Sequence, residues 1–349
     1  MRQKIIISNN STNELESVIE SCNYDHLFIL TDNNTQQLCL GLLNKCRATA
    51  GAYNINIQAA DTNKTLEATA HVWKELSDNK CSRHSCLINL GGGMVTDLGG
   101  FAASTFKRGI DFINIPTTLL AMVDASVGGK TGINFNGLKN EIGVFNEAKA
   151  VIIDSNFLKT LDMANLLSGY AEMLKHSLIC NEGMWAEHVS YDFSSLDYSK
   201  LLDMVKESID VKEKIVIKDP HEKGIRKALN LGHTVGHAFE SIAMKKNKPI
   251  LHGYAVAYGI VCELYLSAIA IGFPTDKLRQ TVNFIHENYG RMAITCDDYE
   301  ELYSLMKHDK KNTDNEINFT LLEDIGRIKI NQTASKKTIF EALDFYREG

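Results

Sequence analysis

The sequence predicts an α/β protein whose first half is a parallel sheet covered by helices and whose second half is mainly helical. In the first half, short apolar runs alternate with longer segments of helical periodicity, a pattern typical of a parallel sheet with helices on its faces. The expected strands are IIIS (5–8), HLFILTD (26–32), YNINIQ (53–58), SCLINLGGG (85–93), DFINIP (111–116) and AVIID (150–154).

From residue 155 onward, apolar positions recur at helical spacing. The expected helical segments are NLLSGYAEMLKHSLI (165–179), LLDMVKESIDVKEKIVI (201–217), ALNLGHTVGHAFESIA (228–243) and the stretch that begins at His252. We therefore expect two domains, residues 1–154 and 155–349, which share an extended interface with a cleft that holds ligands.

The composition favours an enzyme over a small binding module. A chain of 349 residues with 44% apolar content can bury a large core. The formal charge of −6 gives no overall field that attracts nucleic acid or an anionic membrane, so we expect neither as a partner. An anionic substrate must then be bound by a local basic cluster.

No segment predicts export or membrane insertion. The apolar run Ile5–Ile7 is too short for a signal peptide, and the longest apolar stretch, Val256–Phe273, carries Glu263 near its middle, which favours a buried helix. The eight cysteines are scattered without a CxxC pair, which indicates reduced thiols and argues against a disulfide scaffold or a thiolate zinc site. Together these features predict a soluble, cytoplasmic protein.

Three glycines, Gly91 to Gly93, stand between an expected strand and a helical pattern that begins near Met94. Backbone amides at such a helix N-terminus can hold a phosphate. The spacing is not GxGxxG, and a glycine cluster is often only a tight turn. The phosphate site is favoured by the context, because a Pro-Thr-Thr turn follows the next strand.

Polar and cationic residues follow that turn among further glycines: Asp124, Lys130, Lys139 and Asn140. Lysines between glycines can approach a phosphate or a carboxylate closely. Isolated lysines are usually solvated loop residues, but two of them in one glycine-rich stretch favour anion binding.

His233 and His237 lie four residues apart on one face of an expected helix, with Gly232 and Gly236 beside them. Each interior glycine costs a helix about 1 kcal/mol relative to alanine, which suggests that a neighbouring helix packs closely there. That explanation gives the two histidines no role. An HxxxH pair is a helical metal-ligand spacing, although the glutamate of a metalloprotease does not follow His233.

A catalytic metal site needs a third protein ligand, for which Glu172 and His252 are the candidates. Glu172 shares a helical face with Lys175, which would place a cation beside a ligand. The alternative is an i,i+3 salt bridge on a helix surface, which contributes little to stability.

A series of motifs resembles the 3-dehydroquinate synthase family, in that family's order: GGGMVTD, FKRG, PTTLLAMVDASVGGKTG, GLKNEIG, GYAEMLKH, GIRKALNLGHTVGHAFE, LHGYAVAYG and KHDKK. The resemblance runs from about residue 26 to about residue 327. Because many separate motifs agree in order and spacing, it is far more specific than any single motif. It implies a Rossmann-like NAD-binding domain, a mainly helical metal-binding domain and a homodimer.

The resemblance also implies the activity. Members of the family convert 3-deoxy-D-arabino-heptulosonate 7-phosphate into 3-dehydroquinate and phosphate, a phosphorus-oxygen lyase reaction of the shikimate pathway to chorismate and the aromatic amino acids. NAD is used and regenerated within a turnover, because transient oxidation of a ring alcohol makes the neighbouring C–H acidic enough for phosphate elimination. Reduction, ring opening and aldol closure follow. One divalent metal, zinc or cobalt, assists the oxidation.

The resemblance assigns site residues by matching position. The implied metal ligands are Glu172, His233 and His252. The implied NAD contacts are Asp32, Asp61, Lys64, Gly93, Met94, Val95, Thr96, Asp97, Thr117, Thr118, Lys130, Lys139, Phe157, Leu158, Lys159 and Thr160. The implied substrate contacts are Asp124, Lys130, Lys139, Asn140, Lys175, Lys212, Arg226, Asn230, His237, Lys310, Lys311 and, across a dimer interface, Arg108. The residues expected to take part in catalysis are Lys130, Lys175, Lys212, Arg226, Asn230 and His237.

Five positions depart from the family pattern: Ala60, Asp61, Thr96, Ala125 and Tyr254 stand where the family commonly has Gly, Glu, Gly, Ser and Glu. The segment LDMANLLSG also lacks a usual Arg-Glu pair.

These departures leave open a related sugar-phosphate cyclase with another substrate. A metal- and NAD-dependent alcohol or polyol-phosphate dehydrogenase is a second alternative, but it needs fewer cations. An inactive NAD-binding or scaffold protein is a third, and the retained ligands and cations argue against it.

Overall fold

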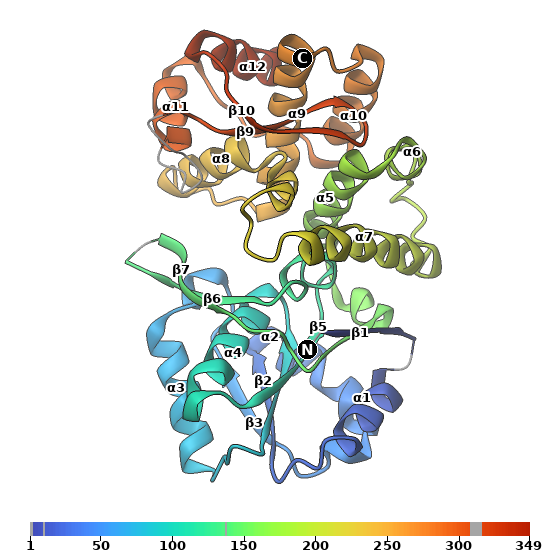
Figure 1. Cartoon of the computed structure of the whole chain (residues 1–349), viewed down its shortest axis with the longest axis vertical. Helices are drawn as coiled ribbons and strands as arrows, with labels where there is room; N and C mark the ends of the chain where they lie inside the picture. Colours follow the sequence, from blue (N-terminus) through green and yellow to red (C-terminus); the bar gives the residue numbers. More distant parts are fainter. Residues whose placement is uncertain (1–2, 10, 137, 308–315) are drawn as a thin grey trace. The chain divides into compact units, whose positions relative to one another are not determined.

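The computed structural model describes residues 3–9, 11–136, 138–307 and 316–349 (Figure 1). The chain forms two compact units. Unit 1 contains Met1–Asp162 and Tyr198–Ile209, and unit 2 contains Met163–Asp197 and Asp210–Gly349. Helix α7 (Tyr198–Lys218) therefore begins in unit 1 and ends in unit 2. The domain boundary between residues 154 and 155 stays a prediction.

Unit 1 is built on a parallel sheet of six strands in the order β1-β8-β5-β4-β2-β3. The strands are β1 (Lys4–Ser8), β2 (Leu27–Asp32), β3 (Tyr53–Ile57), β4 (Cys86–Gly91), β5 (Asp111–Pro116) and β8 (Ala150–Asp154). Every residue of β4 and β8 is buried, as expected for strands covered on both faces. All six strands match those predicted from the sequence, and the α/β prediction is confirmed.

Helices cover both faces of this sheet. They are α1 (Ser11–Glu20), α2 (Asn33–Leu38), α3 (Leu66–Asp78) and α4 (Gly93–Thr105). Helices α3 and α4 lie on one side of the sheet and α1 on the other (Figure 1). The turns that enter α1, α2 and α4 follow the carboxyl ends of parallel strands, the edge at which such sheets commonly bind ligands.

A hairpin of β6 (Lys130–Phe135) and β7 (Leu138–Phe145) follows the sheet strand β5, after a π-helical turn at Ala121–Ala125. The sequence does not predict this hairpin. Its strands are antiparallel, and Gly132 pairs with Gly143. A side chain on either glycine would collide with the backbone of the facing strand, so the close pairing needs both glycines.

Unit 2 is mainly helical, as predicted. Its helices are α5 (Met163–Cys180), α6 (Glu182–Val189), the second half of α7, α8 (His233–Lys245), α9 (His252–Ile271), α10 (Thr275–Tyr289), α11 (Tyr299–Lys307) and α12 (Lys336–Glu348). A hairpin of β9 (Phe319–Asp324) and β10 (Arg327–Gln332) completes it, and the sequence does not predict this hairpin either.

Helix α9 forms the centre of unit 2, where it packs against α5, α8, α10, α12 and β9. Within the part of the chain that the structure describes, it is the one helix long and apolar enough to span a membrane. However, 67% of its apolar window is buried inside the protein. The buried helix predicted around Glu263 is confirmed, since Glu263 itself is fully buried.

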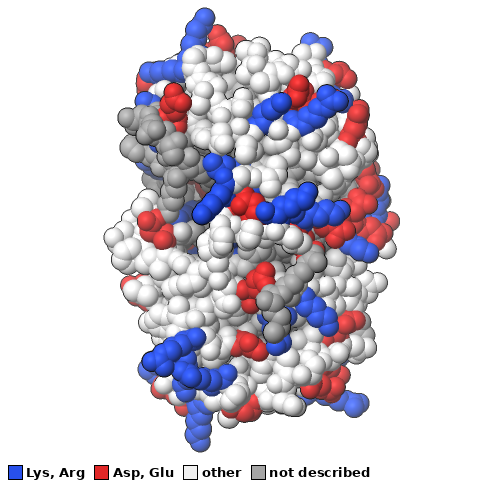
Figure 2. All heavy atoms as spheres, viewed as in Figure 1, with Lys and Arg blue, Asp and Glu red and all other residues white. Residues whose placement is uncertain are grey.

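Both acidic and basic side chains occur across the face shown in Figure 2. This mixture agrees with a formal charge as small as −6. Any electrostatic contribution to function must therefore come from local groups of charged side chains.

Candidate metal and cofactor sites

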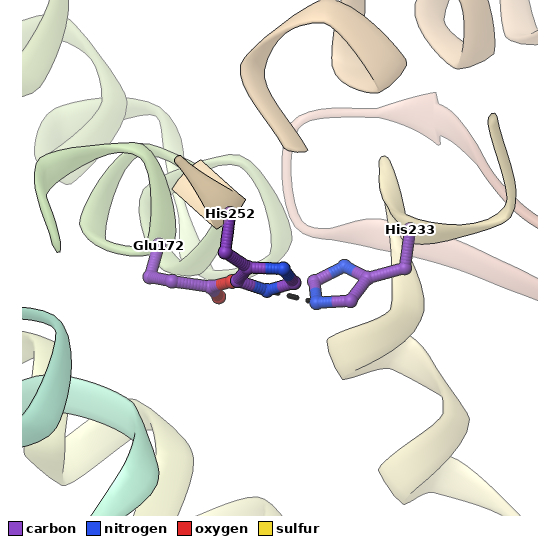
Figure 3. Close-up of side chains that lie close together, drawn as sticks. All are labelled: Glu172, His233 and His252. Carbon is purple, nitrogen blue, oxygen red and sulfur yellow. Dashed lines mark ion pairs between the residues drawn. The ribbon is translucent and has the colours of Figure 1, made fainter. Parts of the chain in front are cut away.

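The three predicted metal ligands lie together in unit 2 (Figure 3). Glu172 comes from the middle of α5, and His233 and His252 are the first residues of α8 and α9. The Nε2 atoms of His233 and His252 lie 3.4 Å and 3.5 Å from Oε1 of Glu172. One donor atom from each residue lies within 4.8 Å of the others, a spacing that suits a single cation. Two imidazole nitrogens and one carboxylate oxygen form a donor set typical of catalytic zinc sites.

Each imidazole has its second nitrogen near an acceptor. Nδ1 of His233 lies 3.1 Å from the carbonyl oxygen of Leu231, and Nδ1 of His252 lies 3.5 Å from Oε2 of Glu240. A proton on each Nδ1 would be directed to these oxygens, which leaves both Nε2 lone pairs directed toward Glu172. This is the tautomer in which a histidine can bind a metal through Nε2.

Glu172 and Lys175 are fully buried and form an ion pair. The alternative of a salt bridge on a helix surface is therefore wrong. Burial alone would raise the pKa of Glu172, but Lys175 and His233 beside it hold that pKa well below its ordinary value. Oε1 of Glu172 is buried and accepts no hydrogen bond from the described residues. A buried anionic oxygen without a donor fits a cation ligand.

The same charges act on His252. Its burial disfavours the charged imidazole, but Glu172 and Glu240 outweigh this effect and raise the pKa of His252 to about 10. The surroundings of His252 are thus electrostatically suited to positive charge.

Close helix packing positions the three predicted ligands. A Cβ on Gly232 would lie 2.8 Å from the carbonyl oxygen of Val256, and one on Gly236 would lie 2.7 Å from that of Ala255. The close neighbour predicted from these glycines is therefore the backbone of α9. Similarly, Gly253 leaves no room for a side chain against Ser168 of α5, and its amide donates to the Ser168 hydroxyl at 3.1 Å.

Three further predicted substrate contacts, His237, Arg226 and Asn230, also belong to unit 2. The His237 ring lies 5.4 Å from that of His233 and 6.0 Å from that of His252, measured between centroids. Arg226 and Asn230 lie in the short helix Ile225–Asn230, directly before α8. The Arg226 guanidinium is buried and donates to the Pro220 carbonyl, and the Asn230 amide donates to Glu222.

Lys212 lies on the part of α7 that belongs to unit 2 and is buried. Two further predicted substrate contacts, Lys310 and Lys311, lie outside the described residues.

In unit 1, most of the predicted NAD contacts lie at the carboxyl edge of the sheet, after the four adjacent strands β8, β5, β4 and β2. Asp32 ends β2 and caps α2 by accepting from the backbone amides of Asn34 and Thr35. The segment from Gly93 through Met94, Val95 and Thr96 to Asp97 begins α4, Thr117 and Thr118 follow β5, and Phe157 to Thr160 follow β8. The amide of Thr117 donates to the Gly91 carbonyl at 3.0 Å, which ties the two central turns together.

These contacts differ in what they can offer a ligand. Phe157 and Leu158 are buried in the core, so only their backbone groups are available. The Lys159 side chain is exposed and donates to Asn156. The Thr160 hydroxyl donates to the Phe157 carbonyl.

A second polar cluster joins the start of α4 to the β6–β7 hairpin. Lys64 is buried and donates to Asp97 and to Asn140, each at 2.5 Å. Lys139 forms an ion pair with Asp61 at 3.3 Å. Burial raises the pKa of Asp97, and Lys64 partly offsets this. The predicted residues Lys64, Asp97 and Asn140 are thus brought into direct contact.

The other predicted substrate contacts of unit 1 lie in the π-helical turn, in the β6–β7 hairpin and after α4. Asp124 is half-buried in the π-helical turn, Lys130 begins β6 with an exposed side chain, and Lys139 is on β7. The two lysines therefore lie on strands, whereas the alternative interpretation placed them in a loop. Arg108 is exposed beyond α4, with a φ of 71°.

The departures from the family pattern are accommodated locally. The Thr96 hydroxyl donates to the Gly93 carbonyl at 3.1 Å. Ala125 faces Gly93, where an added Cβ would lie 3.1 Å from it. Tyr254 packs against the ring of Tyr289, with centroids 5.2 Å apart.

Two glutamates near the metal ligands were not predicted as site residues. Glu240 follows His233 and His237 on the same face of α8, so the helical period offered a signal for it. For Glu263, the sequence shows only a charged residue within an apolar run, which does not indicate a role at a site.

Comparison with known proteins agrees with this geometry. The family models 3-dehydroquinate synthase N-terminal and 3-dehydroquinate synthase C-terminal match residues 54–168 and 169–312. The 3-dehydroquinate synthase of Parabacteroides distasonis is 54% identical over 346 residues, which cover 99% of this chain and 98% of that protein.

Two solved structures share the fold. A 2-deoxy-scyllo-inosose synthase complexed with carbaglucose-6-phosphate, NAD+ and Co2+ gives a TM-score of 0.84 at 21% identity, over 99% of this chain and 96% of that one. A 2-epi-5-epi-valiolone synthase from Streptomyces hygroscopicus with NAD+ and Zn2+ bound gives 0.83 at 21% identity, over 100% and 97%. The two family models and the full-length relative identify the sequence more closely: the chain belongs to the 3-dehydroquinate synthase family.

Proposed function

We propose that this protein is a lyase that converts 3-deoxy-D-arabino-heptulosonate 7-phosphate into 3-dehydroquinate and phosphate, in the shikimate pathway. The observation that carries the proposal is the buried Glu172 carboxylate faced by two imidazoles, in a chain 54% identical to a 3-dehydroquinate synthase over nearly its whole length. An inactive relative would have no reason to keep a buried, charged donor set of this kind.

The proposed cofactors are NAD and one divalent metal. When bound, NAD supplies a reversible hydride acceptor, which allows a ring alcohol to be oxidised and later reduced within one turnover. When bound, the metal supplies a Lewis acid that favours deprotonation of that alcohol. Glu172, His233 and His252 would hold the metal. Zinc and cobalt both suit two imidazoles and a carboxylate, and the solved relatives contain one or the other.

The residues proposed for NAD belong to unit 1. No side chain caps the N-terminus of α4 at Gly92, so its first backbone amides are available to the pyrophosphate. Asp32 and Asp61 are the acidic acceptors for hydroxyl groups, and Lys64 would remain held by Asp97. The threonines after β5 and the segment Phe157–Thr160 would complete the contacts.

Cationic side chains bind the two anionic groups of the proposed substrate, its carboxylate and its phosphate. The proposed cations are Lys130, Lys139, Lys175, Lys212, Arg226, Lys310, Lys311 and Arg108. Because the chain is acidic overall, an anionic substrate requires local cations such as these. Asp124, Asn140 and Asn230 add polar contacts that orient the sugar.

His237 is proposed to organise proton transfer near the phosphate. Its ring lies beside His233, close to the reacting carbon atoms if the substrate binds at the metal ligands. The leaving phosphate is itself a plausible base for the elimination, in which case His237 holds the phosphate in the required orientation.

The test is a turnover assay with metal-loaded protein, NAD and the seven-carbon substrate. Released phosphate, carbocyclic product and NADH absorbance are followed together. Phosphate and 3-dehydroquinate in equal amounts, with no accumulating NADH, are expected. Accumulating NADH would indicate a dehydrogenase instead. If the protein binds NAD and the metal but shows no turnover, it acts on another sugar phosphate or is inactive. Both accumulation of NADH and lack of turnover would contradict the proposal.

We also propose a cytoplasmic homodimer in which Arg108 of one copy serves the partner's site. The β6–β7 hairpin of unit 1 exposes apolar side chains that a second copy could cover, namely Phe135, Leu138, Val144 and Phe145. Sedimentation should give a dimer. Mixing inactive Arg108→Ala with inactive Glu172→Gln should restore activity in mixed dimers, whereas no recovery would contradict a shared site.

A further inference from the structure

Helix α9 carries a single Asp, Glu, Lys or Arg residue, Glu263, which is fully buried. A carboxylate removed from water is strongly destabilising unless hydrogen-bond donors satisfy it. Its surroundings therefore show what it does in the fold.

Both oxygens of Glu263 accept hydrogen bonds from the N-terminus of α8. Oε2 accepts from the Gly232 amide at 2.6 Å, and Oε1 accepts from the Val235 amide at 3.2 Å. In an ordinary capped helix, the side chain of the N-cap residue accepts from the third helical amide, and a glutamate of the same helix accepts from the N-cap amide. Here one carboxylate from another helix occupies both positions.

Helix α8 cannot supply this cap from its own N-cap residue. That residue, Gly232, has a φ of 79° and no side chain. A Cβ there would lie 2.6 Å from Cγ1 of Ile260 and 2.8 Å from the carbonyl oxygen of Val256. A capping Ser, Thr, Asp or Asn is thus excluded by strain and by contact with α9.

The two capped amides flank His233, which is the first residue of α8. Glu263 belongs to the helix that begins with His252, about three turns further along. One buried carboxylate therefore ties the helix start that carries one proposed ligand to the helix that carries another. The positive end of the α8 dipole strengthens this link.

We propose that Glu263 is a positioning residue, which caps α8 from α9 and so holds His233 and His252 at the spacing that a metal requires. This inference rests on the proposed metal site. It predicts that loss of the cap loosens the placement of His233 before it unfolds unit 2. A core group without this role would change stability alone.

The experiment measures metal affinity in the full-length protein by competition with a chelator, and the visible absorption of the Co2+ form. Glu263→Gln keeps the shape but presents an amide nitrogen to one of the two donors. Glu263→Asp keeps the charge but is one carbon shorter. The matched control is Ser267→Ala on the same helix. Ser267 is buried, and its hydroxyl donates to the Glu263 carbonyl of α9 and accepts from the Leu322 amide of β9, so neither bond involves α8.

Both Glu263 variants should bind Zn2+ and Co2+ about 10- to 100-fold more weakly than the wild type, in the range seen when outer groups of a metal site are lost. Their Co2+ absorption should shift in position or intensity. Ser267→Ala should keep wild-type affinity and absorption, although its Tm falls. If Glu263→Gln does not fold, Glu263→Asp decides by the same criteria.

Wild-type affinity and an unchanged Co2+ spectrum in a folded Glu263 variant would overturn the positioning role and leave the metal site intact. Equal weakening in Ser267→Ala would also overturn it, since any core change would then have the same effect. If the wild type itself binds neither ion, the proposed metal site fails, and this inference fails with it.

Discussion

The second nitrogen of each proposed ligand imidazole is near an oxygen of the protein, and for His252 that oxygen belongs to Glu240. Replacing Glu240 by Gln should weaken Zn2+ binding by about 10- to 100-fold, because the carboxylate both orients the ring and increases its basicity. Chelator competition measures this change. The control is Glu301→Gln, which removes an exposed ion pair with Lys245. Equal affinity in wild type and Glu240→Gln would contradict the role.

Lys175 balances the charge of Glu172 inside unit 2. In the presence of EDTA, Lys175→Met should lower the free energy of unfolding by about 3 to 5 kcal/mol. The substitution breaks a buried ion pair and leaves the Glu172 carboxylate buried without its lysine partner. Zinc should restore part of this loss by supplying another cation. Urea denaturation with and without zinc measures both effects.

The control for this variant is Lys74→Met, which breaks an exposed i,i+4 pair with Asp78. Its effect should be about 0 to 1 kcal/mol, with or without zinc. A Lys175 effect as small as that of Lys74 would show that the buried pair contributes no more than a surface one.

Through its resemblance to the family, the sequence predicted Glu172, His233 and His252 as one group, and they do lie together, whereas the HxxxH spacing alone paired His233 with His237. It could not predict that Glu263 caps α8, because that contact depends on how two helices pack. Periodicity shows which face of a helix is apolar, but not which backbone amides of a neighbouring helix lie opposite one side chain.

At the scale of elements, strong apolar runs between turn signals predicted every strand of the parallel sheet. The two hairpins were missed for different reasons. In β6–β7, glycines interrupt the alternation that marks a strand, and seven of the eight residues of β7 are exposed. In β9–β10, the run FTLLED, of which the first four residues are buried, is too short to separate a strand from a helix by periodicity.

The turn between β4 and α4 provides a test of the proposed pyrophosphate site. A Cβ on Gly92 would lie 3.1 Å from Cγ2 of Thr118, in the space between the two turns predicted to contact NAD. Gly92→Ala should therefore displace at least one phosphate contact. A hydrogen bond to a charged group contributes about 1.5 to 3 kcal/mol, so NAD should bind about 10- to 150-fold more weakly.

Calorimetric titration with NAD measures this effect. Gly41→Ala is the matched control, because an added Cβ there meets nothing within 4 Å and the backbone is not left-handed. Unchanged NAD affinity in folded Gly92→Ala would exclude this turn as the pyrophosphate site.

For the whole molecule, the division into two units predicts separate ligand effects. Zinc at a hundred times its Kd should stabilise the structure it binds by about 2.7 kcal/mol and slow amide exchange in α5, α8 and α9. NAD should slow exchange at the turns after β2, β4 and β5. Hydrogen-exchange mass spectrometry with each ligand alone measures this pattern, and protection by NAD confined to unit 2 would contradict the assignment.

The pairing of β1 with β8 has a consequence for biosynthesis. Lys4 of β1 pairs with Ala150 of β8, so β1 leaves the ribosome long before the strand with which it pairs. At about 5 to 20 residues per second, the apolar run Ile5–Ile7 waits roughly 7 to 30 seconds for that partner. During this interval an unpaired apolar strand is a target for chaperones or for association with other nascent chains.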